Sequence, residues 1–385
     1  MTEGERDEAV LDDPEALATA DPGEMLRAVA TAGAQVRAAV ALADGARADL
    51  DRVAAEGRPR TVVVAGMGGS GASAEVLASV AGLRCPVPIL ADRGYLLPGW
   101  VGPMDLVVAV SCSGQTEETL AVADEAARRG CRLVTVGAVD SPLAQRSEQA
   151  RGLHLAVDPG RRPPRANIWS LSVPLLVLAD ALGLVTMPTA ALETTADLLD
   201  EAARSYGPAV PTYDNPAKSL AIELSGSLPY LWGSSDLAGV AAVRFANQLS
   251  ENAKVPSVQG VLPEAHHNQV VAFAGRFGSG APAREHDLFR DRVDDEPSFP
   301  RIRVIVLRDS EEHPQVTARV AATLELAEEH DIPIREVAAV EGSALDRLAS
   351  LVAVADFASV YLALLEGTDP TPIDPITRLK RRIAR

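Results

Sequence analysis

Short apolar runs alternate along the chain with longer segments in which apolar residues recur every three or four positions. The apolar runs of the first half predict strands, and they are TVVVAG at 61–66, PVPILAD at 86–92, DLVVAVSCSG at 105–114 and RLVTVGA at 132–138. Helical spacing follows the first run at 71–82 and the third run at 115–130. Strands that alternate with helices predict a parallel α/β sheet.

The same order returns in the second half of the chain. Strands are predicted at 228–235, 256–261, 301–309 and 333–339, and helices at 236–254, 316–331 and 343–366. We therefore predict an α/β fold of two tandem doubly wound parallel sheets, each a flavodoxin-like αβα sandwich, in domains that span 51–205 and 206–385. A helical segment at 1–50 precedes them, and the polar stretch at about 276–300 is predicted to be an inserted loop.

Composition and charge exclude several classes of function. The chain has 385 residues, 47% of them hydrophobic, and a net charge of −17. This charge repels nucleic acid and anionic membrane surfaces, so neither is an expected partner. The acidic N-terminus lacks the features of a signal peptide and no long uninterrupted apolar run predicts a membrane span, so the cytoplasm is the expected location. The irregularly spaced cysteines, Cys85, Cys112 and Cys131, predict neither a disulfide framework nor a metal site.

The first predicted strand ends in a glycine-rich turn, GMGGSG at 66–71, that leads into a helix. Gly69 and its neighbouring glycines allow the backbone to approach an anion closely, and Ser70 adds a hydroxyl. The turn has no lysine of the kind that a nucleotide-binding P-loop carries, and it can equally be a tight strand-to-helix connection. The pattern suits a phosphate but is not specific for one.

A second loop, SCSGQTEET at 111–119, follows the third predicted strand and also opens a helix. Ser111, Ser113 and Thr116 place three hydroxyls within six residues, which is more than one helix cap requires. Ser113 or Thr116 can act as an ordinary N-cap, but together with the helix N-terminal amides the hydroxyls form a nest suited to a phosphate dianion. The two loops together favour a small phosphorylated ligand.

With both loops present, the chain resembles the sugar isomerase (SIS) domain family, and within it the two-domain phosphoglucose/phosphomannose isomerases, over 50–275 and 300–385. The resemblance implies a cofactor-free, metal-free aldose–ketose isomerase that interconverts fructose 6-phosphate with glucose 6-phosphate and mannose 6-phosphate through a cis-enediol. It also implies that the substrate phosphate is bound by Gly69, Ser70, Ser111, Ser113 and Thr116.

Two catalytic roles are implied by the same resemblance. Arg165, in RRPPRANIW, places a guanidinium where it stabilises an enediolate. Glu251, in SENAK, is the base that moves a proton between C2 and C1 of the sugar. On an α-helix Glu251 shares a face with Gln248 and Asn252.

The other implied roles fall on a histidine pair and on the C-terminal segment. His267 opens the sugar ring from the neighbouring subunit, so that a homodimer is required for activity, whereas His266 is at most accessory. Lys380 lies near the ring oxygen, and Thr371 allows both C2 epimers to bind. The family often carries glutamate where this chain has Gln269, which raises the question of how His267 is oriented.

Three other functions stay open. A protein with these loops can bind a phosphosugar as a regulator without turning it over, although Glu251 and His267 argue against this function. It can also isomerise another sugar phosphate. A nucleotide-binding enzyme would explain the glycine turn, and Asp92 at the end of a predicted strand fits that alternative, but the second loop is then unexplained.

Overall fold

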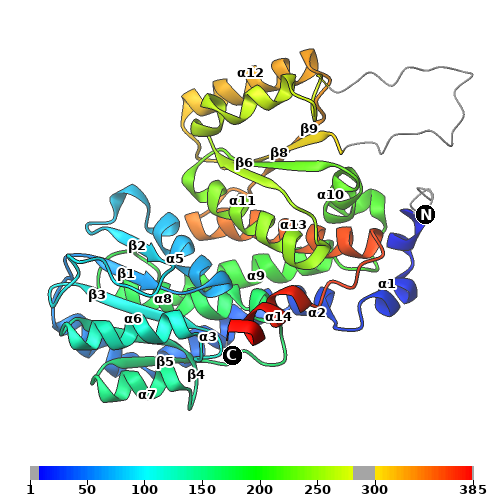
Figure 1. The fold of residues 1–385 in the computed structure, drawn as a ribbon. Helices are drawn as coiled ribbons and strands as arrows, with labels where there is room; N and C mark the ends of the chain where they lie inside the picture. Colours follow the sequence, from blue (N-terminus) through cyan, green and yellow to red (C-terminus); the bar gives the residue numbers. More distant parts are fainter. Residues whose placement is uncertain (1–7, 281–299, 384–385) are drawn as a thin grey trace, which may run out of the picture. The chain divides into compact units, whose positions relative to one another are not determined.

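The computed structural model describes residues 8–280 and 300–383 (Figure 1). It divides into two compact units, which we name after their sheets. The sheet A unit comprises Glu24–Ser205 and Gly342–Ala349, and the sheet B unit comprises Met1–Gly23, Tyr206–Glu341 and Ser350–Arg385. Most of the stretch at 276–300, predicted to be an inserted loop, lies outside the described residues.

Sheet A contains five parallel strands in the order β2-β1-β3-β4-β5. Its strands are β1 (Val62–Ala65), β2 (Ile89–Asp92), β3 (Leu106–Ser111), β4 (Arg132–Ala138) and β5 (Leu153–Val157). The helices of this unit are α2 (Met25–Ala30), α3 (Ala32–Gly45), α4 (Arg47–Ala55), α5 (Gly68–Ala81), α6 (Glu117–Arg128), α7 (Pro142–Gln149), α8 (Ile168–Ala181) and α9 (Thr189–Ser205).

The central strands of sheet A are buried on both faces. Val63 and Val107 pack into the core beneath α6, while the alternate residues Val64 and Val108 are equally buried on the opposite face. Strands with helices on both sides consist of continuous apolar residues, which is why the sequence predicts β1 and β3 clearly.

Two elements of this unit were not predicted from the sequence. β5 is a short edge strand in which buried and half-buried residues alternate, so it lacks the continuous apolar run of the central strands. α7 is capped by Ser141, whose Oγ accepts the Ala144 N–H over 3.2 Å, and it buries only Leu143 and Ser147. Both segments are too short, at five and eight residues, for their periodicity to be distinctive.

Sheet B repeats the strand order of the first four strands of sheet A. Its four parallel strands run in the order β7-β6-β8-β9, with β6 (Leu228–Gly233), β7 (Val258–Val261), β8 (Ile302–Arg308) and β9 (Ile334–Ala338). The helices of the sheet B unit are α1 (Pro14–Ala20), α10 (Pro216–Leu224), α11 (Asp236–Gln248), α12 (Pro314–Glu329) and α14 (Asp374–Ile383). The predicted fold class of two doubly wound parallel sheets is confirmed.

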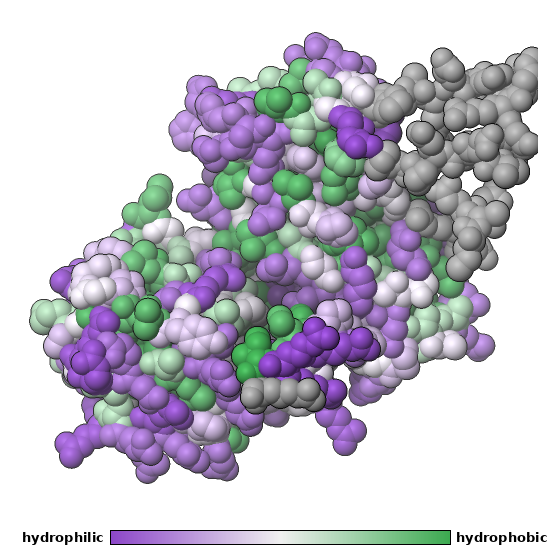
Figure 2. Space-filling view, in the orientation of Figure 1, coloured by the Kyte–Doolittle hydropathy of each residue, from purple (hydrophilic) through white to green (hydrophobic). Residues whose placement is uncertain are grey.

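One further helix, α13 (Ala344–Leu365), begins in the sheet A unit and continues into the sheet B unit. By length and composition alone it could cross a membrane, but 94% of its most apolar window is buried inside the protein. A long, mostly apolar helix that is buried in this way is typical of a protein core. The face of the molecule seen in Figure 2 is mostly hydrophilic, with hydrophobic residues in small separate groups.

Candidate active site

The two predicted phosphate loops lie side by side at the carboxyl edge of sheet A. β1 and β3 are neighbours, and the chain leaves β1 for β2 on one side and β3 for β4 on the other. Such a switch point opens the crevice in which doubly wound sheets bind their ligands. The Cys112 N–H donates to Ser70 Oγ over 3.2 Å, which joins the first loop directly to the second. The structure therefore brings together the residues predicted to bind phosphate.

The first loop has room only for glycine at its closest approach. A Cβ on Gly71 would lie 2.6 Å from the Gly66 carbonyl oxygen, and Gly68 has φ +53°. α5 begins at Gly68 without a side-chain cap, so no capping side chain occupies its first amides. The loop thus presents N–H groups and the positive end of the helix dipole to an anion.

The second loop presents hydroxyls beside another uncapped helix. Ser111 Oγ and Thr116 Oγ1 lie 2.9 Å apart, and Ser113 Oγ accepts the Gln115 N–H over 3.3 Å. Thr116 occupies the N-cap position of α6, but its side chain makes no cap hydrogen bond. Ser111 is fully buried and Ser113 is exposed, so the hydroxyls run from the end of the strand to the surface. These features favour phosphate binding over simple helix capping.

Arg165 lies beside the first loop, on a short 3₁₀ turn, Pro164–Ala166. A Cβ on Gly69 would lie 3.6 Å from the Arg165 Cα, and the Arg165 side chain is buried. Gln35 on α3 holds the turn, because its Nε2 donates to the Ala166 carbonyl oxygen over 2.8 Å. The predicted arginine and the predicted phosphate loops therefore belong to one unit and lie next to each other.

Arg162, in the same segment, was not predicted as a site residue. Its Nε donates to Asn167 Oδ1 over 2.9 Å and its Nη2 donates to the Asp158 carbonyl oxygen over 3.0 Å, so the guanidinium is held in one orientation. Burial raises the pKa of the Cys112 thiol, and the positive charge of Arg162 opposes that rise. The charge of Arg162 therefore reaches the second loop. The only feature of the sequence that could have pointed to Arg162 is its place in RRPPR, and an arginine in such a segment is usually a solvated loop charge.

Glu251 lies in the sheet B unit on a π-helical turn. α11 ends at Gln248, and Leu249–Ala253 continue it with π-helical geometry. The predicted α-helical face is therefore wrong here: Gln248 and Asn252 are buried, whereas Glu251 is only half-buried. A π turn changes the direction of the following side chains relative to the helix, and such turns are frequent at functional sites.

Lys254 ends this turn in the left-handed conformation, with φ +61°. Its Nζ donates to the carbonyl oxygens of Glu251 over 2.6 Å, Asn252 over 3.2 Å and Pro370 over 3.4 Å. A lysine in this position satisfies acceptors that the helix end leaves open. The bond to Pro370 also brings the Glu251 turn together with the segment that carries Thr371.

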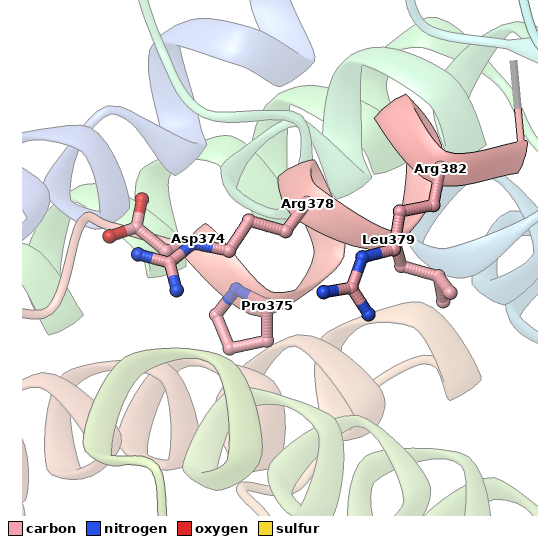
Figure 3. Close-up of a pocket in the computed structure, with 5 residues that line it drawn as sticks. All are labelled: Asp374, Pro375, Arg378, Leu379 and Arg382. Carbon is pink, nitrogen blue, oxygen red and sulfur yellow. The ribbon is translucent and has the colours of Figure 1, made fainter. Parts of the chain in front are cut away.

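Thr371 and Lys380 lie on the C-terminal segment of the sheet B unit. Thr371 packs against Gly23, where an added Cβ would lie 2.0 Å from Thr371 Oγ1. Lys380 is exposed on α14. The same helix lines a shallow hollow, and Figure 3 shows the residues that form it, which are Asp374, Pro375, Arg378, Leu379 and Arg382. Lys380 is not among them, and in the described part of the chain it makes no hydrogen bond or ion pair with Glu251.

The histidine pair follows β7 on a 3₁₀ turn, Glu264–His267. The His266 ring packs edge-on against Trp232, with ring centroids 5.6 Å apart, and its Nε2 shares a hydrogen bond with Thr323 Oγ1 over 2.9 Å. Burial lowers the pKa of His266. His267 is exposed. His266 therefore belongs to the packing of the sheet B unit, and His267 is the histidine that a ligand or a second copy can reach.

Gln269 is bound to the core and not to His267. Its Oε1 accepts the Trp232 Nε1–H over 2.6 Å, and its Nε2 donates to the Gln259 carbonyl oxygen over 3.0 Å. Glutamine supplies both the acceptor and the donor that this position needs, whereas an ionised glutamate could not donate. The departure from the family pattern at Gln269 therefore fits the packing around Trp232.

The corresponding switch point of sheet B carries carboxylates. Ser235 Oγ donates to Asp309 Oδ2 over 2.7 Å, and the Asp309 N–H donates to Ser234 Oγ over 2.8 Å. The Glu312 side chain is also buried nearby, at 7% exposure, where it is ion-paired with Arg308. Because carboxylates repel phosphate, sheet A offers the better site. Within residues 8–280 and 300–383, no group of three or more His, Cys, Asp or Glu side chains is placed to hold a metal ion.

Comparison with known proteins agrees with this geometry. The family described as "Bacterial phospho-glucose isomerase C-terminal SIS domain" matches residues 213–383. A bifunctional phosphoglucose/phosphomannose isomerase from Caldicellulosiruptor bescii is 31% identical over 323 residues, which cover 84% of this chain and 89% of that protein. The chain belongs to this SIS isomerase family. The resemblance inferred from the two loops is thereby confirmed.

Two other proteins show how wide the similarity is. A D-glucosamine-6-phosphate 4-epimerase from Sulfolobus acidocaldarius is 29% identical over 214 residues, which cover 56% of this chain and 64% of that protein. The solved structure of a hypothetical protein from Thermus thermophilus shares the fold, with a TM-score of 0.68 over 96% of this chain and 94% of that chain at 16% identity.

The predicted site residues of this SIS isomerase fall into two groups. The phosphate loops and Arg165 lie together in the sheet A unit, whereas Glu251, His267, Thr371 and Lys380 belong to the sheet B unit. Their individual roles stay predictions.

Proposed function

We propose that this SIS protein is an aldose–ketose isomerase that interconverts fructose 6-phosphate with glucose 6-phosphate and mannose 6-phosphate. The observation that carries the proposal is the pair of phosphate loops at the sheet A switch point, joined by the hydrogen bond between Cys112 and Ser70 and flanked by Arg165. The relative from Caldicellulosiruptor bescii, which is named for both activities and spans most of the chain, supports this choice of substrates.

We assign the proton transfers to a single carboxylate. Glu251 takes the proton from C2 of the open-chain aldose phosphate and returns it to C1, while the hydroxyl proton passes from O2 to O1 through the cis-enediol, which gives the ketose. Arg165 stabilises the negative charge on the enediolate oxygens. His267 moves the proton that opens the ring, Lys380 binds near the ring oxygen, and Thr371 admits both C2 epimers. No net oxidation occurs, because one carbon is reduced as its neighbour is oxidised.

The proposal includes a homodimer to which His267 contributes from the neighbouring copy. The exposed position of His267 supports this arrangement. Large hydrophobic side chains are also exposed on and after the edge strand β2, and they are Leu90, Tyr95, Leu96, Trp100 and Met104. Apolar groups of this kind mark association surfaces. We place the reaction in the cytoplasm, because charged sugar phosphates remain in the compartment in which they are made.

Activity on another sugar phosphate is the second candidate function. The Sulfolobus acidocaldarius relative, which is named a D-glucosamine-6-phosphate 4-epimerase, favours it, because the same phosphate loops can hold a different sugar. A protein that binds a phosphosugar without turning it over is the third candidate.

One assay separates these candidates. Purified protein in EDTA is incubated with fructose 6-phosphate, and glucose 6-phosphate and mannose 6-phosphate are quantified separately. Both products are expected. Glucose 6-phosphate alone would narrow the proposal to one epimer, and binding of fructose 6-phosphate without either product would contradict it in favour of the other two candidates.

The phosphate loops are tested by removing the hydroxyls of Ser111 and Ser113 together. Because a hydrogen bond to a charged group contributes about 1.5–3 kcal/mol, the Ser111→Ala, Ser113→Ala variant should raise KM for fructose 6-phosphate roughly 10²-fold. The matched control is Ser79→Ala with Ser147→Ala, one half-buried and one buried serine of the same unit outside both loops. If KM for both double variants equals that of the wild type, the phosphate binds elsewhere.

A further inference from the structure

A column of buried polar side chains joins α11 to α13 beneath the turn that carries Glu251. Arg244 Nε and Nη2 donate to Asp356 Oδ1 over 2.8 Å and Oδ2 over 2.6 Å, and Gln248 Nε2 donates to the same Oδ1 over 3.3 Å. Exposure of these three residues is 7% or less. Arg244 and Gln248 are four residues apart on α11, so both face Asp356 from one side of the helix.

The next hydrogen bond of the column involves Asn252, which lies in the π-helical turn. Asn252 Nδ2 donates to Ser359 Oγ over 2.9 Å, and the Ser359 hydroxyl donates in turn to the Asp356 carbonyl oxygen over 2.7 Å. Asn252 and Ser359 are both fully buried. The Ser359 hydroxyl therefore donates a hydrogen bond within α13 and accepts one from the π-helical turn.

The hydrogen bond from Asn252 to Ser359 fixes the residue next to Glu251. A π turn is rare compared with an α-helix, and unusual backbone forms persist where the surrounding structure holds them. On one side the Asn252 amide is tied to α13, and at the far end Lys254 binds the carbonyl oxygens of Glu251 and Asn252. Glu251, half-buried, directly precedes Asn252, and its own carbonyl oxygen accepts from Lys254, so both contacts hold the backbone that carries it.

We propose that Ser359 is a positioning residue that, through Asn252, holds the π-helical turn in the form that directs the Glu251 carboxylate at the substrate. The inference rests on the proposed role of Glu251 as the base. The Ser359 side chain is fully buried and bonds to Asn252 and to the Asp356 carbonyl oxygen, so it acts on Glu251 through Asn252 and changes the accuracy of proton transfer.

The test compares Ser359→Ala with the wild type, using glucose 6-phosphate labelled with deuterium at C2. Because a small displacement of a catalytic group lowers the rate strongly, kcat should fall about tenfold or more in Ser359→Ala while KM is unchanged. The share of deuterium that is lost to solvent instead of delivered to C1 should rise, since a misdirected carboxylate leaves the enediol exposed for longer. Ser359→Thr keeps the hydroxyl and should restore both values toward those of the wild type.

The matched control is Ser172→Ala, which removes another fully buried serine hydroxyl, one without a hydrogen-bond partner, from α8. It should leave kcat, KM and the deuterium partition unchanged. The partition is a property of each turnover, so a loss of folded protein lowers kcat without moving it. A normal partition in Ser359→Ala would therefore overturn the positioning role. No turnover by the wild type would instead overturn the proposed function, and the two failures are distinguished before any variant is made.

Discussion

The Glu251→Gln variant is expected to lose about 10²- to 10⁴-fold in kcat for both epimeric products, which is the contribution of a positioned general acid–base group. Glutamine keeps the size of the side chain, and the half-buried position of Glu251 on the π-helical turn tolerates a neutral group. Substrate affinity should not fall, because the phosphate loops that hold the substrate are unchanged. Steady-state kinetics and calorimetric titration with fructose 6-phosphate measure the two quantities separately.

The control for this variant is Glu329→Gln, the same chemical change at an exposed glutamate of α12 in the same unit. Its kcat should match that of the wild type. A Glu251→Gln protein that retains the wild-type kcat would remove Glu251 as the base. A protein that loses fructose 6-phosphate binding along with activity would instead make Glu251 a binding residue.

The fold could be predicted from the sequence wherever strands are buried on both faces. β1 and β3 are continuous apolar runs because helices cover both of their sides, and the glycine turn and the hydroxyl loop follow them directly. β5, α7 and α10 were not predicted, because with five, eight and nine residues they are too short for a distinctive period. The phosphate loops were predictable for a further reason: their chemistry is local, and each is contained in a few consecutive residues.

The surroundings of Glu251 could not be predicted in the same way. The α-helical spacing of this segment does not indicate a π-helical turn, and the hydrogen bonds of Gln248 and Asn252 go to α13, more than a hundred residues away. The fixed position of Arg162 could not be predicted, because the contacts of its guanidinium with Asn167 and with the Asp158 carbonyl oxygen depend on how the loop folds. From the sequence alone, Gln269 was expected to affect the orientation of His267. In the structure the Gln269 side chain bonds to Trp232 and Gln259 instead.

The ion pair at the base of the polar column should be the most sensitive point for stability. The Arg244 side chain is 5% exposed and that of Asp356 is 10% exposed. Asp356→Ala leaves the guanidinium buried without its counter-charge, and removing one partner of a buried pair costs about 3–5 kcal/mol in the free energy of unfolding. This is a large part of the roughly 5–15 kcal/mol that stabilises a typical domain. The expected result is a marked fall in the urea midpoint.

Two further variants separate the loss of charge pairing from the loss of side-chain volume. Glu201→Ala breaks the exposed pair with Arg204, where both side chains are about two-thirds exposed, and should cost less than about 1 kcal/mol. Arg244→Met combined with Asp356→Leu removes both buried charges and should recover most of the stability that Asp356→Ala loses, because well-packed apolar residues can replace a buried pair. Equal urea midpoints for Asp356→Ala and Glu201→Ala would show that the buried pair contributes no more than a surface one. A double variant as unstable as Asp356→Ala would show that packing, and not the uncompensated charge, sets the cost.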